Sequence, residues 1–241
     1  MITVKDLVKN YNGRRAVDQV SFTVNKGEIF GLLGPNGAGK TTILRIMSTI
    51  LKADKGEVFI GGFSGRERPD MVRKIIGVCP QEIALYPDLT CRENMVYFGV
   101  IGGLSRKKAL KSSEEILREV KLEDRAEEKV SSLSGGMKRR LNLAVSLLNE
   151  PRVLFMDEST AGVDPRSREA IFNLLHQFKK GEITVVYSTH YMEEAERLCD
   201  RVAIMNAGRI IALDSPAALK RNLDPGGNIS LEEVFLKLTE E

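Results

Sequence analysis

The sequence is poor in the features that mark secreted, membrane-spanning and nucleic-acid-binding proteins. Only three of its 241 residues are cysteines, an odd number without CxxC spacing, so we expect free cytosolic thiols rather than disulfides or a metal cluster. The longest uncharged run, residues 94–105, is about half as long as a membrane-spanning helix needs to be. The first residues include Lys5 and Asp6, and we expect no signal peptide because its apolar core is missing. The net charge of +3, from 36 basic and 33 acidic residues, is too balanced to indicate nucleic acid as a partner.

The composition is that of a globular chain with a substantial core. Hydrophobic residues make up 42% of the sequence and charged residues 29%, values typical of soluble domains. The length of 241 residues suits one large domain or two small ones, and no internal repeat or low-complexity segment divides the chain.

The most informative stretch is residues 34–41, which read Gly-Pro-Asn-Gly-Ala-Gly-Lys-Thr and fit the phosphate-binding pattern G-x-x-x-x-G-K-[ST]. An apolar run of strand length, residues 28–33, precedes it, and residues 41–47 follow with apolar side chains at helical spacing. A glycine-rich turn between a strand and a helix aims backbone N–H groups and the positive end of the helix dipole at one point. A turn that binds nothing is the alternative, but all eight positions and both flanks fit, so we predict a bound nucleoside triphosphate.

The residue types within this motif predict how each one contacts the nucleotide. Glycine lets the backbone close around phosphate oxygens without a Cβ in the way. Lys40 is expected to reach the β- and γ-phosphates, and the hydroxyl of Thr41 to ligate Mg²⁺. The residues predicted to contact the nucleotide here are Gly34, Asn36, Gly37, Gly39, Lys40, Thr41 and Thr42.

A second strong signal is the apolar run of residues 153–156 followed by Asp157 and Glu158. A buried strand that ends in two acids places them at the mouth of a parallel sheet, where ligands bind. Asp157 suits Mg²⁺, reached through water, and Glu158 can take a proton from an attacking water. The pair could instead be a solvated strand end, an alternative that the phosphate motif elsewhere in the chain disfavours.

Three further residues stand in suggestive places, each with an ordinary alternative. Tyr11, in a turn between the first two strands, could stack on a base or be a half-buried packing residue. Gln81 follows a buried strand, where a lone glutamine is usually a capping or surface residue. His190 lies at the end of the buried strand 184–189 and is better placed than His176, which falls in the middle of a helix.

Two helix starts complete the candidates. Residues 134–136, Ser-Gly-Gly, precede a helix expected over about 138–148 and offer a second anion-binding geometry, although such a turn is also an ordinary helix start. Asp164 is expected to cap a helix that begins at Pro165 and runs to about residue 178.

The order of these patterns predicts an alternating α/β chain with a helical insertion. Residues 2–32 are rich in strands that alternate at period two. Residues 85–138 carry helical patterns instead, at 93–98 and from 105 to 120. Four residues are expected on the apolar side of the second of these helices: Leu110, Ile116, Leu117 and Val120.

The last part of the chain carries turn and cap signals. Residues 201–212 read as a hairpin with a glycine turn. Pro225, Gly226 and Gly227 predict a break, and residues 230–236 predict a short helix with Ser at its N-cap and Glu three positions later.

Taken in order, these motifs resemble the nucleotide-binding subunit of an ATP-binding cassette (ABC) transporter, over nearly the whole chain from Ile2 to Ala212. The most specific match is residues 133–137, Leu-Ser-Gly-Gly-Met, which are similar to the signature sequence that separates this family from kinases, GTPases and other phosphate-loop proteins. The resemblance implies roles for residues that were ambiguous alone: Tyr11 as the adenine-stacking aromatic, Gln81 as the Q-loop glutamine, Asp164 as the D-loop aspartate and His190 as the switch histidine.

The sequence departs from the family pattern in two places. Ser159 stands where the family usually has proline after the Asp-Glu pair, which could loosen the turn that aims Glu158. Met137 ends the signature where glutamine is commoner. Residues 85–105 and 231–235 are similar to a subgroup associated with the export of drugs, lipids or polysaccharides.

The resemblance also implies the fold class, which is α/β. We expect a P-loop ATPase core with a parallel sheet flanked by helices, an N-terminal antiparallel β subdomain and an inserted α-helical subdomain. The expected boundaries within a single ABC ATPase domain of residues 1–241 are 1–84 and 151–215 for the core with its β subdomain, 85–150 for the helical signature subdomain, and 216–241 for a tail.

The implied function is ATP hydrolysis that drives a separate integral membrane permease, with export as the direction and the cytoplasmic face of the membrane as the location. ABC cassettes work as head-to-tail pairs, so Ser134, Gly135 and Gly136 of a second subunit, identical or different, are implied to cover the γ-phosphate. ATP and Mg²⁺ are the expected cofactors. In this reading Gln81 acts as a sensor of the metal held at Thr41 and Asp157.

An alternative within the family is a soluble ATPase of the Fe–S cofactor-assembly type that has no permease. Translation types usually carry two cassettes in one chain and repair types carry long coiled-coil insertions, neither of which suits 241 residues without sustained heptads.

Overall fold

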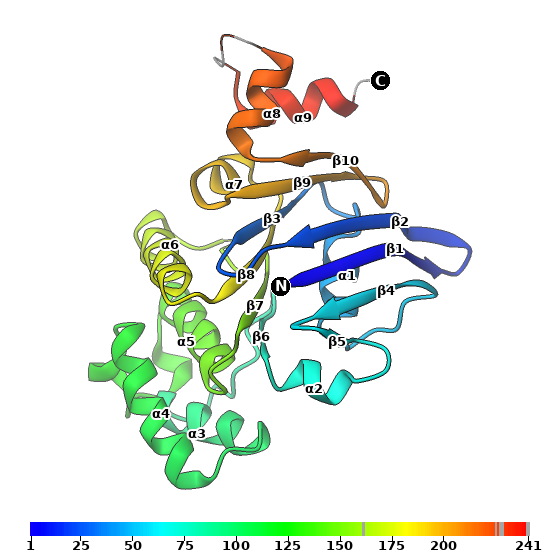
Figure 1. Ribbon diagram of the computed structural model, residues 1–241. Coiled ribbons are helices and arrows are strands. Elements are labelled where there is room, and N and C mark those ends of the chain that lie inside the picture. Colours follow the sequence, from blue (N-terminus) through cyan, green and yellow to red (C-terminus); the bar gives the residue numbers. More distant parts are fainter. Residues whose placement is uncertain (161, 225, 227–228, 240–241) are drawn as a thin grey trace.

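The computed structural model describes residues 1–160, 162–224, 226 and 229–239. The chain folds into two β-sheets with helices around them (Figure 1). Of the predicted break at residues 225–227, Pro225 and Gly227 lie outside the described residues. No described helix is long and apolar enough to cross a membrane.

The central sheet has six strands in the order β10-β9-β3-β8-β7-β6, of which all but β10 run parallel to their neighbours. Its strands are β3 (Ile29–Leu33), β6 (Ile76–Cys79), β7 (Val153–Asp157), β8 (Thr184–Thr189), β9 (Arg201–Asn206) and β10 (Arg209–Asp214). Strands β3 and β8 are buried along their whole length, as the apolar runs in the sequence predict for a sheet covered on both faces. The β9–β10 hairpin is confirmed.

The second sheet is antiparallel, in the order β2-β1-β4-β5. Its strands are β1 (Ile2–Tyr11), β2 (Arg14–Val24), β4 (Lys55–Ile60) and β5 (Phe63–Ser64). The prediction that Tyr11 lies in a turn is wrong, because Tyr11 is the last residue of β1 and pairs with Arg14 at the start of β2. The turn consists of Asn12 and Gly13 alone, whose φ angles of +46° and +82° are those of a tight two-residue hairpin turn.

Alternate side chains of the central strands point into two hydrophobic cores. On one face, Phe30 and Leu32 of β3 pack with the antiparallel sheet and with α1 (Lys40–Met47). On the other face, Ile29 and Leu33 of β3 pack with the helices that follow β6 and β7. Helix α1, which follows the phosphate-binding motif, is therefore held in place by the core that both sheets share.

Three helices lie between β6 and β7 in the chain, and they form the lobe coloured green in Figure 1. They are α3 (Cys91–Ile101), α4 (Arg106–Glu119) and α5 (Gly135–Leu147), with 3₁₀ turns at Glu123–Arg125 and Val130–Ser132. Helix α5 begins three residues earlier than predicted because Ser134 caps it, its Oγ accepting a hydrogen bond from the Met137 N–H.

The predicted apolar side of α4 is partly wrong. Leu117 and Val120 are buried, but Leu110 is 38% exposed and the small residues Ala109 and Ser113 face inward instead. A Cβ added to Gly99 of α3 would lie 2.9 Å from Ala109 Cβ, so the two helices approach closely. Close approach selects small side chains, which a pattern based on large apolar residues overlooks.

The remaining helices are α2 (Pro69–Arg73), α6 (Pro165–Lys180), α7 (Met192–Leu198), α8 (Pro216–Leu223) and α9 (Leu231–Thr239). The predicted caps of α6 and α9 are confirmed, with Asp164 accepting from the Ser167 N–H and Ser230 exchanging bonds with Glu233. Helix α9 packs on α7 and α8 at the top of Figure 1, with Leu231 fully buried. Helices α2, α7 and α8 were not predicted.

The predicted fold class is confirmed: a parallel sheet flanked by helices, an antiparallel β subdomain and a helical insertion. The subdomain boundaries at residues 84, 150 and 215 stay a prediction. All three cysteines are buried and free, and burial raises the pKa of Cys79 to about 12 and of Cys91 to about 11, so these thiols stay protonated.

Candidate functional site

The phosphate-binding motif forms the turn between β3 and α1, and two of its glycines, Gly34 and Gly39, are required by the space around them. Gly34 and Gly39 have φ angles of +153° and +105°, which side-chain-bearing residues rarely adopt. A Cβ on Gly34 would lie 2.3 Å from the Met205 carbonyl oxygen, and a Cβ on Gly39 would lie 2.4 Å from the Ala16 carbonyl oxygen. Neighbouring backbone therefore holds the loop in shape from two sides.

Lys40 is folded back over this loop. Its Nζ donates to the carbonyl oxygens of Gly34 at 2.7 Å and Pro35 at 3.1 Å, and lies 3.2 Å from Glu158 Oε1. Lys40 is only 4% exposed and Glu158 only 7%. The attraction between Lys40 and Glu158 offsets the cost of burying the two side chains beside the loop.

Glu158 is the point where the predicted catalytic residues meet. Its Oε2 lies 3.0 Å from His190 Nδ1 and accepts from Gln81 Nε2 at 3.4 Å. The backbone of Glu158 has φ of +40°, an unusual value for a residue with a side chain, and its N–H donates to the Ser188 carbonyl and hydroxyl. The strand ends of β6, β7 and β8 thus bring three residues together that are far apart in the sequence.

Asp157 lies beside Thr41 at the same edge. Asp157 Oδ1 accepts hydrogen bonds from the Thr41 hydroxyl at 3.1 Å and from the Ser188 hydroxyl at 2.5 Å. A carboxylate oxygen and a hydroxyl oxygen next to a phosphate-binding loop are the hard donors that Mg²⁺ prefers, so the residues present fit this ion. Gln81, which donates to Glu158, adds an amide to the cluster.

A cavity of about 490 Å³ lies at the phosphate-binding loop, and Asp157 and His190 are not among the residues that line it. Seven residues predicted to contact the nucleotide border it, and Gly34 of the same motif does not: Tyr11, Asn36, Gly37, Gly39, Lys40, Thr41 and Thr42. The predicted catalytic residues Gln81 and Glu158 border it as well. Tyr11 lines the cavity and is 43% exposed, and the Nζ of Lys9 lies over its ring, 5.8 Å from the centroid.

The sequence reasoning missed Arg14, Ala16 and Ser188. Arg14 borders the cavity because it pairs with Tyr11 across the hairpin, a position that the correct strand register would have revealed. Ser188 holds both Asp157 and the Glu158 backbone.

The signature residues and Asp164 are not among those that line the cavity. Ser134 and Gly135 are exposed at the start of α5, and Gly136 packs against α6, where an added Cβ would lie 2.1 Å from Ser167 Oγ. Asp164 caps α6 at this contact, and its hydrogen bonds with Ser167 hold the pKa of its carboxyl below the usual value. The starts of α5 and α6 form a separate cluster.

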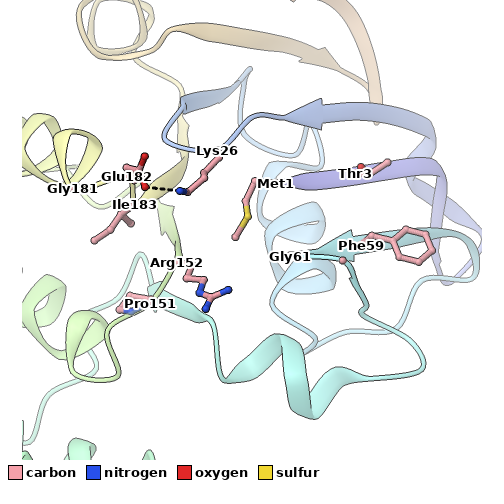
Figure 2. Close-up of a pocket in the computed structure, with 11 residues that line it drawn as sticks. Met1, Thr3, Lys26, Phe59, Gly61, Pro151, Arg152, Gly181, Glu182 and Ile183 are labelled. Atoms are coloured by element: carbon pink, nitrogen blue, oxygen red, sulfur yellow. Dashed lines mark hydrogen bonds and ion pairs between the residues drawn. The ribbon is translucent and has the colours of Figure 1, made fainter.

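Figure 2 shows a larger cavity, of about 820 Å³, on the other edge of the central sheet. Lys26, Arg152 and Glu182 line it from the segments before β3, β7 and β8, and Met1 and Phe59 line it from the antiparallel sheet. Its one drawn ion pair, between Lys26 and Glu182, is largely exposed and so weakly held. Ligands of parallel sheets bind at the carboxyl ends of the strands, so the cavity at the phosphate-binding loop is the candidate site.

Ser159, at the family's usual proline position, has a side-chain oxygen that is buried without a hydrogen-bond partner among the described residues. Replacing it removes this unpaired group, so we expect Ser159→Ala to raise the free energy of unfolding by about 1 kcal/mol, measured by denaturant titration. Ser188→Ala is the matched control and should lower it by about 1 kcal/mol, because it removes bonded hydroxyl contacts. A less stable Ser159→Ala variant would show that this hydroxyl has a partner.

The parallel sheet, the phosphate-binding loop and the acids at the strand ends define a phosphate-loop nucleotide hydrolase with a helical insertion. The comparison with protein families identifies the group within this class. The family model described as "ABC transporter" matches residues 17–161, which is more than half of the chain, and the chain belongs to this family.

Curated relatives agree with this assignment. The chain is 41% identical over 232 residues to the linearmycin resistance ATP-binding protein LnrL of Bacillus subtilis (strain 168), covering 96% of this chain and 74% of that protein. It is 46% identical over 211 residues to the Nod factor export ATP-binding protein I of Paraburkholderia xenovorans (strain LB400), covering 88% and 69%. It is 42% identical over 221 residues to the doxorubicin resistance ATP-binding protein DrrA of Mycobacterium tuberculosis (strain CDC 1551 / Oshkosh), covering 91% and 67%.

Solved structures agree as well. An ATP-binding subunit of an ABC transporter superposes with a TM-score of 0.87 at 29% identity, covering 99% of both chains. The ATP-binding cassette MJ0796, solved as a dimer in a post-hydrolysis state bound to ADP and Pi, superposes with a TM-score of 0.80 at 28% identity, covering 89% of this chain and 98% of that one. The predicted family and ATPase activity are confirmed: the chain is an ATP-binding, ATP-hydrolysing ABC subunit. The soluble Fe–S assembly alternative is not favoured.

Proposed function

We propose that this ATPase drives export through a separate integral membrane permease, at the cytoplasmic face of the membrane. The observation that carries the assignment of its site is the buried ion pair of Lys40 and Glu158 at the phosphate-binding loop, with His190 and Gln81 on the same Glu158 carboxylate. The export direction comes from the similarity to the LnrL, Nod factor and DrrA proteins, whose names refer to resistance or export.

In the proposed mechanism the triphosphate lies on the amides of the loop at the start of α1, with adenine on Tyr11. Lys40 turns from Glu158 to the β- and γ-phosphates, which releases the Glu158 carboxylate to accept a proton from the attacking water. His190 then contacts the γ-phosphate from the end of β8. Mg²⁺ held by Thr41 and Asp157 would neutralise phosphate charge. Gln81 would sense the bound ion from its position beside Glu158.

A second ATP-binding subunit completes the site in this proposal. Ser134 and Gly135 are exposed at the start of α5, a helix of 13 residues, and neither lines the chain's own cavity. A helix start of this kind binds anions. In a head-to-tail pair the start of α5 from one subunit covers the γ-phosphate on the other, with Asp164 beside it, and two ATP molecules lie in the interface.

The permease is proposed to contact α3 and the segment that follows Gln81. This surface exposes large apolar side chains, and it lies in the helical insertion near the site: Ile83, Tyr86, Tyr97, Val100 and Ile101. The rings of Tyr86 and Tyr97 pack edge to face with centroids 4.9 Å apart, which makes a preformed aromatic surface. Exposed apolar patches of this kind mark interaction sites, and Gln81 links this one to the nucleotide.

The partner proposal is tested by isolating tagged Glu158→Gln protein from its native cells, with ATP present, after mild detergent extraction of membranes. We expect a polytopic membrane protein in near-equal amount, because blocked hydrolysis keeps the ATP-bound pair assembled. Lys40→Ala protein is the control and should recover less of it. Recovery of soluble partners alone would contradict the transport proposal and favour the cofactor-assembly type.

A further inference from the structure

Glu194 of α7 is a buried acidic residue that the mechanism above does not use. It is 3% exposed, and its carboxylate accepts hydrogen bonds from three hydroxyl groups. The Tyr187 hydroxyl lies 2.6 Å and the Thr189 Oγ1 3.1 Å from Oε2, and Thr160 Oγ1 lies 2.9 and 3.1 Å from the two oxygens. Arg168 of α6 adds a positive charge, its Nε 3.4 Å from Oε1.

The partners of Glu194 are the neighbours of the residues proposed for hydrolysis. Thr160 follows Glu158 by two positions on the turn after β7, and Thr189 immediately precedes His190 at the end of β8. Thr189 Oγ1 also accepts from the Tyr191 N–H, so it fixes the backbone on the far side of His190. One carboxylate therefore ties together the two backbone segments that carry Glu158 and His190.

The network uses both oxygens of Glu194 as acceptors. Burial, together with nearby Glu194, raises the pKa of Tyr187 well above its usual value, so the phenol keeps its proton and remains a donor. A glutamine at position 194 would offer one acceptor oxygen in place of two. Its NH₂ group would face hydroxyl donors or Arg168, leaving buried groups unpaired.

We propose that Glu194 is a positioning residue for ATP hydrolysis, which holds Glu158 and His190 at their mutual distance of 3.0 Å by anchoring Thr160 and Thr189. This inference rests on the proposed roles of Glu158 and His190. Glu194 is not among the residues that line the cavity at the phosphate-binding loop. It acts by restricting the turn after β7 and the end of β8, since small displacements of reacting groups lower rates strongly.

The test compares Glu194→Gln with Glu193→Gln, a matched change at the exposed neighbouring position of the same helix. We expect Glu194→Gln to lower kcat for ATP roughly 10- to 100-fold, the cost of misplacing a catalytic group by about 1 Å. KM and the equilibrium affinity for a fluorescent ATP analogue should change less than about twofold, because the phosphate-binding loop is untouched. Glu193→Gln should match the wild type in all three quantities. An unchanged kcat in Glu194→Gln, or a loss of affinity equal to the loss of kcat, overturns the proposal.

A double variant separates positioning from a general structural role. Because Glu194 is proposed to act through Glu158 as well as His190, adding Glu194→Gln to Glu158→Gln should lower the residual turnover by a smaller factor than it lowers the wild-type rate. Effects that multiply would mean that Glu194 acts elsewhere and would overturn the proposal. A wild-type rate in Glu158→Gln alone would instead refute the proposed role of Glu158, so the two failures are distinguishable.

Thr160→Val tests the same link from the other side and serves if Glu194→Gln does not fold. It removes one hydroxyl donor to Glu194 at nearly constant volume, and should lower kcat at unchanged nucleotide affinity, whereas Thr160→Ser keeps the hydroxyl and should restore the rate. A folded Thr160→Val protein with wild-type kcat would overturn the proposal.

Discussion

The Glu158→Gln variant is expected to hydrolyse ATP roughly 10²–10⁴ times more slowly than the wild type, which is the usual contribution of a general base. Glutamine keeps the shape of the side chain and can still contact His190 and Gln81, but its amide oxygen cannot accept the proton of an attacking water. The change therefore isolates the proton transfer from the packing of a residue that is 7% exposed.

Nucleotide binding should survive this substitution. Glu158 pairs with Lys40 at 3.2 Å, so removing its charge frees the lysine for phosphate, and ATP affinity should be unchanged or higher. Steady-state phosphate release and equilibrium binding of a fluorescent ATP analogue measure the two quantities separately. Glu57→Gln, an exposed acid on β4, is the control and should behave as the wild type. Near-normal hydrolysis by Glu158→Gln would remove Glu158 from the role of base.

The composition of the site was predictable because its residues follow strands. A parallel sheet brings the carboxyl ends of its strands to one edge, so Gln81 after β6, Asp157 and Glu158 at the end of β7, and His190 after β8 had to converge once those apolar runs were recognised as neighbours. The glycine loop after β3 joins them for the same reason. Strand-end positions are readable from local sequence, and the contacts between them follow from the sheet.

The functional residues that the sequence did not reveal have side chains that face inward from strands and short helices. Ser188 and Glu194 look like an unremarkable strand residue and a surface acid, and only their burial shows that one holds Asp157 and the other holds Thr160. Helix α7 is seven residues long, too short for its apolar periodicity to be recognised. No local pattern in the sequence shows which residues meet across the fold. That the signature residues lie away from the chain's own cavity was therefore implied only by the family resemblance.

The second large effect is expected for Lys40→Ala, which should weaken ATP binding roughly 10- to 100-fold and abolish most turnover at limiting ATP. Hydrogen bonds to charged groups contribute about 1.5–3 kcal/mol, which corresponds to this range of affinities. Lys40 is the cation that the structure places inside the phosphate-binding loop, with its Nζ on the carbonyls of Gly34 and Pro35. Equilibrium titration with a fluorescent ATP analogue measures the loss directly.

The control for Lys40→Ala must account for Glu158, because removing the lysine leaves a buried carboxylate without its partner and can cost several kcal/mol of stability. The double variant Lys40→Ala/Glu158→Gln removes both charges, so its unfolding temperature should recover while its ATP affinity stays low. Recovery of affinity in the double variant would mean that Lys40 only neutralises Glu158 and binds no phosphate. Unchanged affinity in Lys40→Ala itself would count against the phosphate-binding loop as the nucleotide site. Weak binding in both, with stability restored in the second, assigns the loss to the missing contact between Lys40 and phosphate.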